Sequence, residues 1–190
     1  MKGVMVVRKA LVGFLVVGLV MGLMSSLASA GNPALYNKGV EMMIKSRDVM
    51  KKAVDTIQKG QKMYMQICTG KGCAADVAQG NQKIDDGINE GRKGLALLDQ
   101  GQKAYQLGKR KKNLTAAHVG VEKMIEGGRM VQEALNVIED GVKMNNEVLR
   151  AKNLAAQVEA PTKTILKGTE SGLTGIKQFL DGQKLVMENK

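Results

Sequence analysis

Small residues recur at every seventh position along most of the chain after residue 33, and apolar residues flank them at three- and four-residue spacings. Such spacings indicate amphipathic α-helices, because they place the apolar side chains on one helical face. The seven-residue period also keeps the small residues on one face, once every two turns. The pattern therefore predicts long helices at about 33–68, 73–110, 115–158 and 161–188.

A Gly-x-Lys motif recurs once in each predicted helix at a fixed spacing: the motifs that begin at Gly60, Gly101, Gly141 and Gly182 are 41, 40 and 41 residues apart. Stepping back from each motif by sevens gives sixteen slots, of which twelve are glycine, and Pro161 fills one of the others. A fixed period of this length is typical of internal repeats. We call the small residues in these slots the glycine seam: Gly39, Ser46, Ala53, Gly60, Gly80, Gly87, Gly94, Gly101, Gly120, Gly127, Ala134, Gly141, Gly168, Gly175 and Gly182.

The seven-residue phase slips at 69–72, 109–113 and 159–162, where turn-forming residues cluster. These short loops favour neighbouring helices that run in opposite directions. The fold class is therefore expected to be all-α: an antiparallel up-down-up-down four-helix bundle of four repeats of about 41 residues, each a single helix. The structural alternative is a pair of splayed helical hairpins that a second chain completes.

A glycine inside a helix costs about 1 kcal/mol relative to alanine, so the seam requires a compensating contact. Without Cβ atoms, two helices approach more closely than the usual separation of about 8–10 Å and gain dispersion contacts. Two interpretations follow. The seam packs helices within one chain, or part of it faces outward and drives self-assembly or clasps a ligand.

The first thirty residues have the pattern of a secretory signal peptide. A basic start precedes an apolar run from Ala10 to Met24, and Ala28-Ser29-Ala30 supplies the small residues that signal peptidase requires. The apolar run is shorter than the ~20 residues of a spanning helix. We expect cleavage before Gly31, export to the periplasm or medium of a bacterium, and no transmembrane segment after processing. The mature chain, 31–190, is expected to be a single four-helix domain.

The mature chain is basic, with 26 Lys and Arg against 18 Asp and Glu. The densest basic cluster is Lys109-Arg110-Lys111-Lys112, in the second predicted loop. It is expected to be a solvated loop or to bind an anionic envelope surface such as lipid headgroups, lipopolysaccharide or another polyanion. Few aromatic residues are present, which argues against a β-rich domain and against sequence-specific nucleic-acid binding.

Cys68 and Cys73 are the only cysteines and bracket the first predicted turn. In an oxidising compartment such a pair predicts a disulfide. The sequence also contains two weaker patterns of metal-binding residue types. The single histidine, His118, cannot build a di-iron bundle, so charge pairing is expected for it. Thioether sulfurs bind Cu(I), although methionine at helical spacing is usually core. The methionines considered for copper are Met42, Met43, Met50, Met63 and Met65.

The sequence contains no nucleophile–base pair, phosphate-binding loop or set of metal ligands at a recognised spacing. We therefore expect no enzymatic activity and no cofactor. The first hypothesis is a structural or interaction protein of the cell envelope, with another copy of itself or a second envelope protein as partner. The alternatives are the binder of anionic surfaces and the methionine-based Cu(I) binder.

Overall fold

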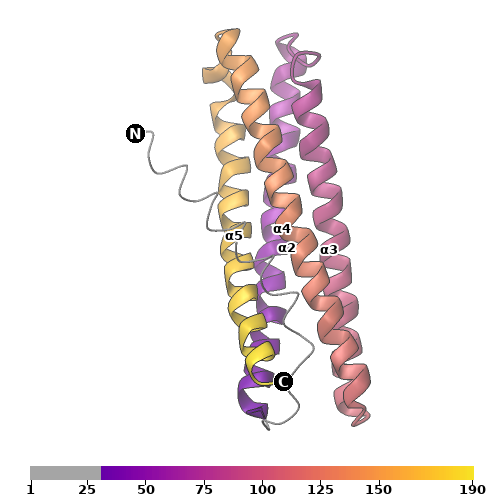
Figure 1. Ribbon diagram of the computed structural model, residues 1–190. Helices are drawn as coiled ribbons and strands as arrows, with labels where there is room; N and C mark the ends of the chain where they lie inside the picture. Colours follow the sequence, from indigo (N-terminus) through magenta and orange to yellow (C-terminus); the bar gives the residue numbers. More distant parts are fainter. Residues whose placement is uncertain (1–30) are drawn as a thin grey trace. The chain divides into compact units, whose positions relative to one another are not determined.

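A computed structural model describes residues 31–190 (Figure 1). The expected signal peptide, 1–30, lies outside these residues. The described part of the chain is all-helical and contains no strand, and its four long helices pack against one another, which confirms an all-α four-helix bundle. The elements are α2 (Pro33–Gly70), α3 (Ala78–Arg110), α4 (Leu114–Ala151), the 3-10 helix η1 (Ala155–Val158) and α5 (Glu159–Glu188).

The helices form two closely packed pairs, α3 with α4 and α2 with α5. By contrast α2 and α3, which are neighbours in the sequence, touch at few places, and so do α4 and α5. The corners that follow α2 and α4 lie at one end of the bundle, and the α3–α4 corner lies at the other (Figure 1). The α2–α3 and α4–α5 hairpins are thus splayed, and each fills the space between the arms of the other.

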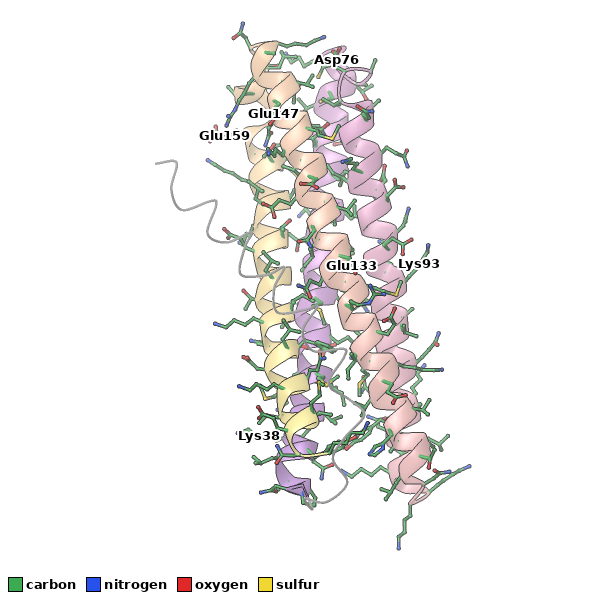
Figure 2. The ribbon with its side chains drawn as sticks, viewed as in Figure 1. Lys38, Asp76, Lys93, Glu133, Glu147 and Glu159 are labelled. Carbon is green, nitrogen blue, oxygen red and sulfur yellow. The ribbon has the colours of Figure 1, made fainter. Side chains whose placement is uncertain are left out.

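Membrane crossing by these helices is not supported: from residue 31 onward, none combines the length and the apolarity that a bilayer span requires. Charged side chains instead project from their outer faces, among them Lys93 on α3 and Glu133 and Glu147 on α4 (Figure 2). The apolar side chains meet inside, where Met43, Ile57 and Ile138 are fully buried.

The three corners share one backbone geometry. In each, one residue in the left-handed region follows the helix, and the next residue donates its backbone N–H to a carbonyl five positions earlier. Only glycine adopts this conformation freely, and asparagine tolerates it better than most residues. The left-handed residues are Gly72 (φ 70°), Lys112 (φ 53°) and Asn153 (φ 59°).

The third corner corrects the sequence-based boundaries. It was expected at 159–162, with the third helix continuing to residue 158, but α4 ends at Ala151 and the chain turns at Asn153. Pro161 lies in the first turn of α5, where the missing N–H has no partner to lose. The second helix also begins later than the expected residue 73, because a turn over 73–77 precedes Ala78.

Asn113 begins α4 by accepting a hydrogen bond from the backbone N–H of Ala116, at 2.9 Å. We expect Asn113→Ala to lower the free energy of unfolding by about 1 kcal/mol, since this N–H then loses its protein partner. Asn113→Asp, which keeps an acceptor oxygen, should remain within a few tenths of a kcal/mol of the wild type. Urea denaturation of the three proteins measures both effects. Equal stability of the alanine variant would contradict this role of the cap.

Candidate functional site

The glycine seam lies along the two close helix pairs. On α3 and α4, residue numbers rise along one helix as they fall along the other. A Cβ built at Gly94 would lie 2.7 Å from the carbonyl oxygen of Gly127, and one at Gly141 would lie 2.6 Å from that of Gly80. Real Cβ atoms do not approach backbone this closely, so the two helices pack at a distance that only glycine permits. The facing seam pairs are Gly80–Gly141, Gly87–Ala134, Gly94–Gly127 and Gly101–Gly120.

The seam residues of α2 and α5 face one another in the same way. A Cβ at Gly39 would lie 2.5 Å from the carbonyl oxygen of Gly182. The non-glycine slots Ser46 and Ala53 lie opposite glycines, so each close approach still involves at least one glycine. The remaining pairs are Ser46–Gly175, Ala53–Gly168 and Gly60–Pro161. The seam residues are buried against other helices of the same chain and are not available to an external partner.

A buried amide pair extends this packing at the end that carries the first corner. Asn145 on α4 donates its side-chain N–H to the Oδ1 of Asn81 on α3, at 3.1 Å, and both residues are at most 5% exposed. The amide group of Asn145 also occupies the space that a Cβ at Gly80 would need. Sequence analysis missed this pair. The available signal was two asparagines beside seam glycines, on faces where the neighbouring turns are apolar.

Cys68 and Cys73 lie at the same end of the bundle, in a cluster with Tyr64, Leu149 and Val158. Both thiols are free and buried in the structure. Burial, followed by interaction with the Cys73 thiol, raises the pKa of Cys68 to about 12. The backbone N–H of Cys73 donates to the carbonyl of Cys68 at 2.9 Å, which holds the two residues close together. The expected disulfide between them stays a prediction.

Oxidation of this pair should stabilise the protein by about 2 kcal/mol, because a short loop is closed in the unfolded chain. The difference should grow above the usual thiol pKa of about 8.5. In that range the unfolded thiols ionise while Cys68 stays protonated in the fold, so the reduced protein loses stability as pH rises towards 12. The oxidised protein has no thiol to titrate. Urea denaturation with and without reductant at pH 7 and pH 10, together with thiol counting, measures both effects.

A Cys68→Leu/Cys73→Leu variant is the control, because leucines occupy the equivalent positions of the α4–α5 corner, Leu149 and Leu154. It should show no dependence on reductant. A wild-type stability that reductant leaves unchanged, with two free thiols after purification from the periplasm, would contradict the disulfide.

The five methionines considered for copper do not form one cluster. Met43 and Met50 are fully buried in the core, and their side chains pack against the seam glycines Gly182 and Gly175. Met63 is 37% exposed, more than two turns further along α2. Packing against glycine accounts for the buried methionines, since a flexible side chain fills the space beside the missing Cβ atoms.

The basic cluster lies at the α3–α4 corner, and Lys109, Arg110, Lys111 and Lys112 are all exposed. The ammonium of Lys109 lies 5.9 Å from the centre of the Tyr105 ring, whose hydroxyl donates to Asn37 on α2 at 2.8 Å.

The single histidine, His118, packs near the ring of Tyr36 at 6.0 Å between ring centres. The expected charge pairing of His118 has no ion pair to support it among the described residues.

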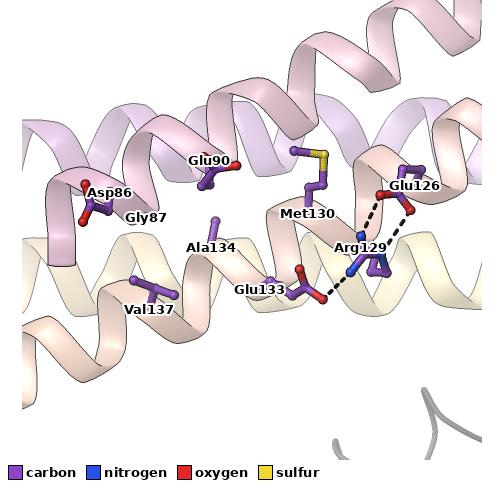
Figure 3. Close-up of a pocket in the computed structure, with 9 residues that line it drawn as sticks. All are labelled: Asp86, Gly87, Glu90, Glu126, Arg129, Met130, Glu133, Ala134 and Val137. Carbon is purple, nitrogen blue, oxygen red and sulfur yellow. Dashed lines mark hydrogen bonds and ion pairs between the residues drawn. The ribbon is translucent and has the colours of Figure 1, made fainter.

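An open groove of about 360 Å³ lies between α3 and α4 (Figure 3). Arg129 spans its rim, with hydrogen bonds to Glu126 at 2.6 Å and to Glu133 at 2.5 Å. The hydrogen bond from Arg129 lowers the pKa of Glu126 below its usual value. The Glu126 carboxylate is therefore ionised at neutral pH, and it shares the Arg129 cation with Glu133.

The chemistry of this groove is limited. Gly87 and Ala134 are in close contact in this groove, and its remaining acids, Asp86 and Glu90, lie on α3, with Asp86 at the opposite end from Arg129 (Figure 3). Within residues 31–190, three or more histidine, cysteine or acidic side chains nowhere converge in the geometry of a metal site.

Comparison of the chain with protein-family models, with curated proteins and with solved structures finds no match.

Proposed function

We propose that the protein is an exported, non-enzymatic structural or interaction protein of the bacterial cell envelope. Its scaffold is an antiparallel up-down-up-down bundle of four repeats of about 41 residues, and the seam is what packs these repeats tightly. The observation that carries the proposal is the continuous burial of the seam along both close helix pairs. A chain that accepts the helix-propensity cost of so many glycines gains a closely packed scaffold, while its outer faces stay charged.

Internal equivalence supports the repeat. A shift of 81 residues superposes Asn32 on Asn113, Gly60 on Gly141 and Gly101 on Gly182. The same shift carries α2 onto α4 and α3 onto α5, so that it exchanges the two close helix pairs. This relation is typical of a two-fold arrangement of two hairpins, each of which buries its apolar face only against the other. The proposed repeat is therefore supported by the two-fold relation between the hairpins as well as by the sequence period.

Export is tested with the full chain carrying a C-terminal tag. After fractionation of the bacteria, we expect the tagged protein in the periplasm or medium with Gly31 as its first residue. A chain that retains residues 1–30 inside the cytoplasm would exclude an envelope role.

The structural role is tested in a strain that lacks the protein and is challenged with detergent. Wild-type protein and the Arg129→Ala variant should restore resistance equally, because the groove has no catalytic part in the proposal. A variant with a weakened seam should fail. Rescue by a protein with a disrupted bundle, or loss of rescue in Arg129→Ala alone at normal abundance, would point to an activity instead.

A second candidate function is binding to anionic envelope surfaces through residues 109–112. The supporting observation is that a tight corner holds four exposed basic side chains at one end of the bundle, and that within residues 31–190 no acid forms an ion pair with them. Vesicles with anionic lipid should co-sediment with the mature protein at low salt and release it at high salt. Changing all four residues to glutamine should abolish binding, whereas glutamine at Lys59, Lys62, Lys83 and Lys93 should weaken it less. Equal loss of vesicle binding in both variants would mean that binding depends only on the net charge of the protein.

A further inference from the structure

One outer face of α5 carries apolar side chains that the bundle covers only in part. Leu166, Leu173 and Leu180 are each 41% exposed and follow one another at seven-residue spacing. A heptad of leucines places the three side chains on one line along the helix. We call these three residues the leucine stripe. Within a single bundle the stripe is only partly covered, so its period calls for a further explanation.

The other hairpin shows that a leucine is not required at these positions. The 81-residue shift superposes the stripe on Asp85, Arg92 and Asp99 of α3. All three make polar contacts with α2: Asp85 accepts from Gln61 at 2.7 Å, Arg92 donates to Gln58 at 2.6 Å, and Asp99 accepts from Arg47 at 2.7 Å. One hairpin thus closes this face with its own polar bridges, whereas the other leaves it apolar.

Charged residues lie beside the stripe on both sides of Leu173. Their order is such that a second α5 running in the opposite direction would place acids opposite bases. Glu170 precedes Leu173 by three positions and Lys177 follows it by four, while Lys167 and Asp181 lie further out on either side. Among the described residues none of these four charges forms an ion pair. The outer lysines, by contrast, are paired within the chain, Lys163 with Glu159 and Lys184 with Glu188.

We propose that the leucine stripe is a dimer interface, on which a second copy of this chain docks its own α5 in the opposite direction. The two-fold axis passes close to Leu173. Leu173 then meets its own copy, and Leu166 meets Leu180 of the second copy. Glu170 faces Lys177 of the second copy, and Lys167 faces Asp181, so that the flanking charges form four ion pairs. A parallel pairing would place these charges of the two copies on opposite sides of the interface, where the four ion pairs could not form.

With this interface, the partner of the proposed interaction protein is a second copy of the chain. Only the biological role of the dimer rests on the proposed function. The pairing itself is a property of the purified chain. A monomeric chain in solution would therefore remove the dimer and leave export and the envelope role to their own tests.

Sedimentation velocity of the mature chain, 31–190, over about 5 to 200 µM tests the interface. We expect a reversible dimer, weak because the stripe is short. Leu173→Arg, which introduces the residue type found at the equivalent position of α3, should raise the dissociation constant by at least about tenfold. Leu114→Arg is the matched control, because Leu114 is 76% exposed and lies outside the stripe. A monomer at about 200 µM, or equal effects of the two substitutions, would overturn the proposal.

Charge reversal tests the direction of pairing. Glu170→Lys should weaken the dimer about fivefold, since two ion pairs become repulsive contacts, and adding Lys177→Glu to the same chain should restore it. Failure of the double variant to recover would overturn the antiparallel pairing. Single cysteines in a Cys68→Leu/Cys73→Leu background give a second reading. Leu173→Cys should cross-link two copies, whereas Leu180→Cys should not, because its copies are about 20 Å apart along the helix axes.

A membrane as the occupant of the stripe would produce a different result. The chain would then remain monomeric, and Leu173→Arg would reduce its binding to phospholipid vesicles while the 109–112 cluster is intact. That outcome overturns the self-association.

Discussion

Gly94→Ala should lower the free energy of unfolding by about 2 kcal/mol, although alanine is the better helix former by about 1 kcal/mol. The added Cβ would lie 2.7 Å from the carbonyl oxygen of Gly127 and 2.9 Å from a methyl group of Val131. The carbonyl belongs to the backbone of α4 and cannot rotate away, so α3 and α4 must separate locally. Overpacking of this kind typically costs about 1–3 kcal/mol.

Gly91→Ala is the matched control, one turn earlier on the same helix. Gly91 is also buried, but its Cβ would lie 3.4 Å from Val54 and 3.5 Å from Ala134, which are ordinary van der Waals distances. The gain in helix propensity should therefore prevail and raise the free energy of unfolding by up to about 1 kcal/mol. Urea denaturation followed by circular dichroism compares the two variants. Stabilisation by both substitutions would show that the seam does not limit the approach of the helices.

The distinction between these two glycines was accessible from the sequence. Gly94 is a seam residue and Gly91 is not, because the seven-residue period includes only the first of them. The period identifies the face on which close approach occurs, since a helix repeats its orientation almost every seven residues. It predicted long helices and the first two corners, where glycine or a run of lysines interrupts the phase.

The third corner was misplaced because its residues give a weak signal. Lys152-Asn153-Leu154 contains neither glycine nor proline, and Asn153 adopts the left-handed conformation that a glycine holds in the first corner. Pro161 predicts a helix boundary at its own position, but proline is tolerated anywhere in the first turn. A comparison of the corners at a 40- or 41-residue spacing would have located the turn correctly.

The pairing of helices could not be derived from periodicity alone. A period specifies which face of a helix is buried, but it does not specify which helix covers that face. Short loops suggested that neighbours in the sequence pack together, yet α2 packs mainly on α5. The residue types in the seam are consistent with this pairing, because the non-glycine residues Ser46 and Ala53 of α2 lie opposite the glycines Gly175 and Gly168 of α5.

Side-chain complementarity across the bundle was also beyond the sequence pattern. Gly128 lies outside the seam, and its role becomes visible only in three dimensions, where the ring of Phe179 on α5 occupies the space beside its Cα. Phe179 is 1% exposed and is among the largest fully buried side chains. The 81-residue shift superposes this pair on Arg47 and Leu98, so the ring and the missing side chain occur together in one hairpin only.

Phe179→Ala should therefore lower the free energy of unfolding by about 3–5 kcal/mol, because it leaves a cavity where the ring was. Gly128→Ala should cost about 2 kcal/mol, since its Cβ would overlap a ring that its neighbours hold in place. Phe179→Leu, the residue type of the other hairpin, removes this overlap. In its background the cost of Gly128→Ala should fall by at least about 1 kcal/mol, a coupling that a double-mutant cycle in urea measures. Additive costs would mean that the ring and the glycine do not depend on each other.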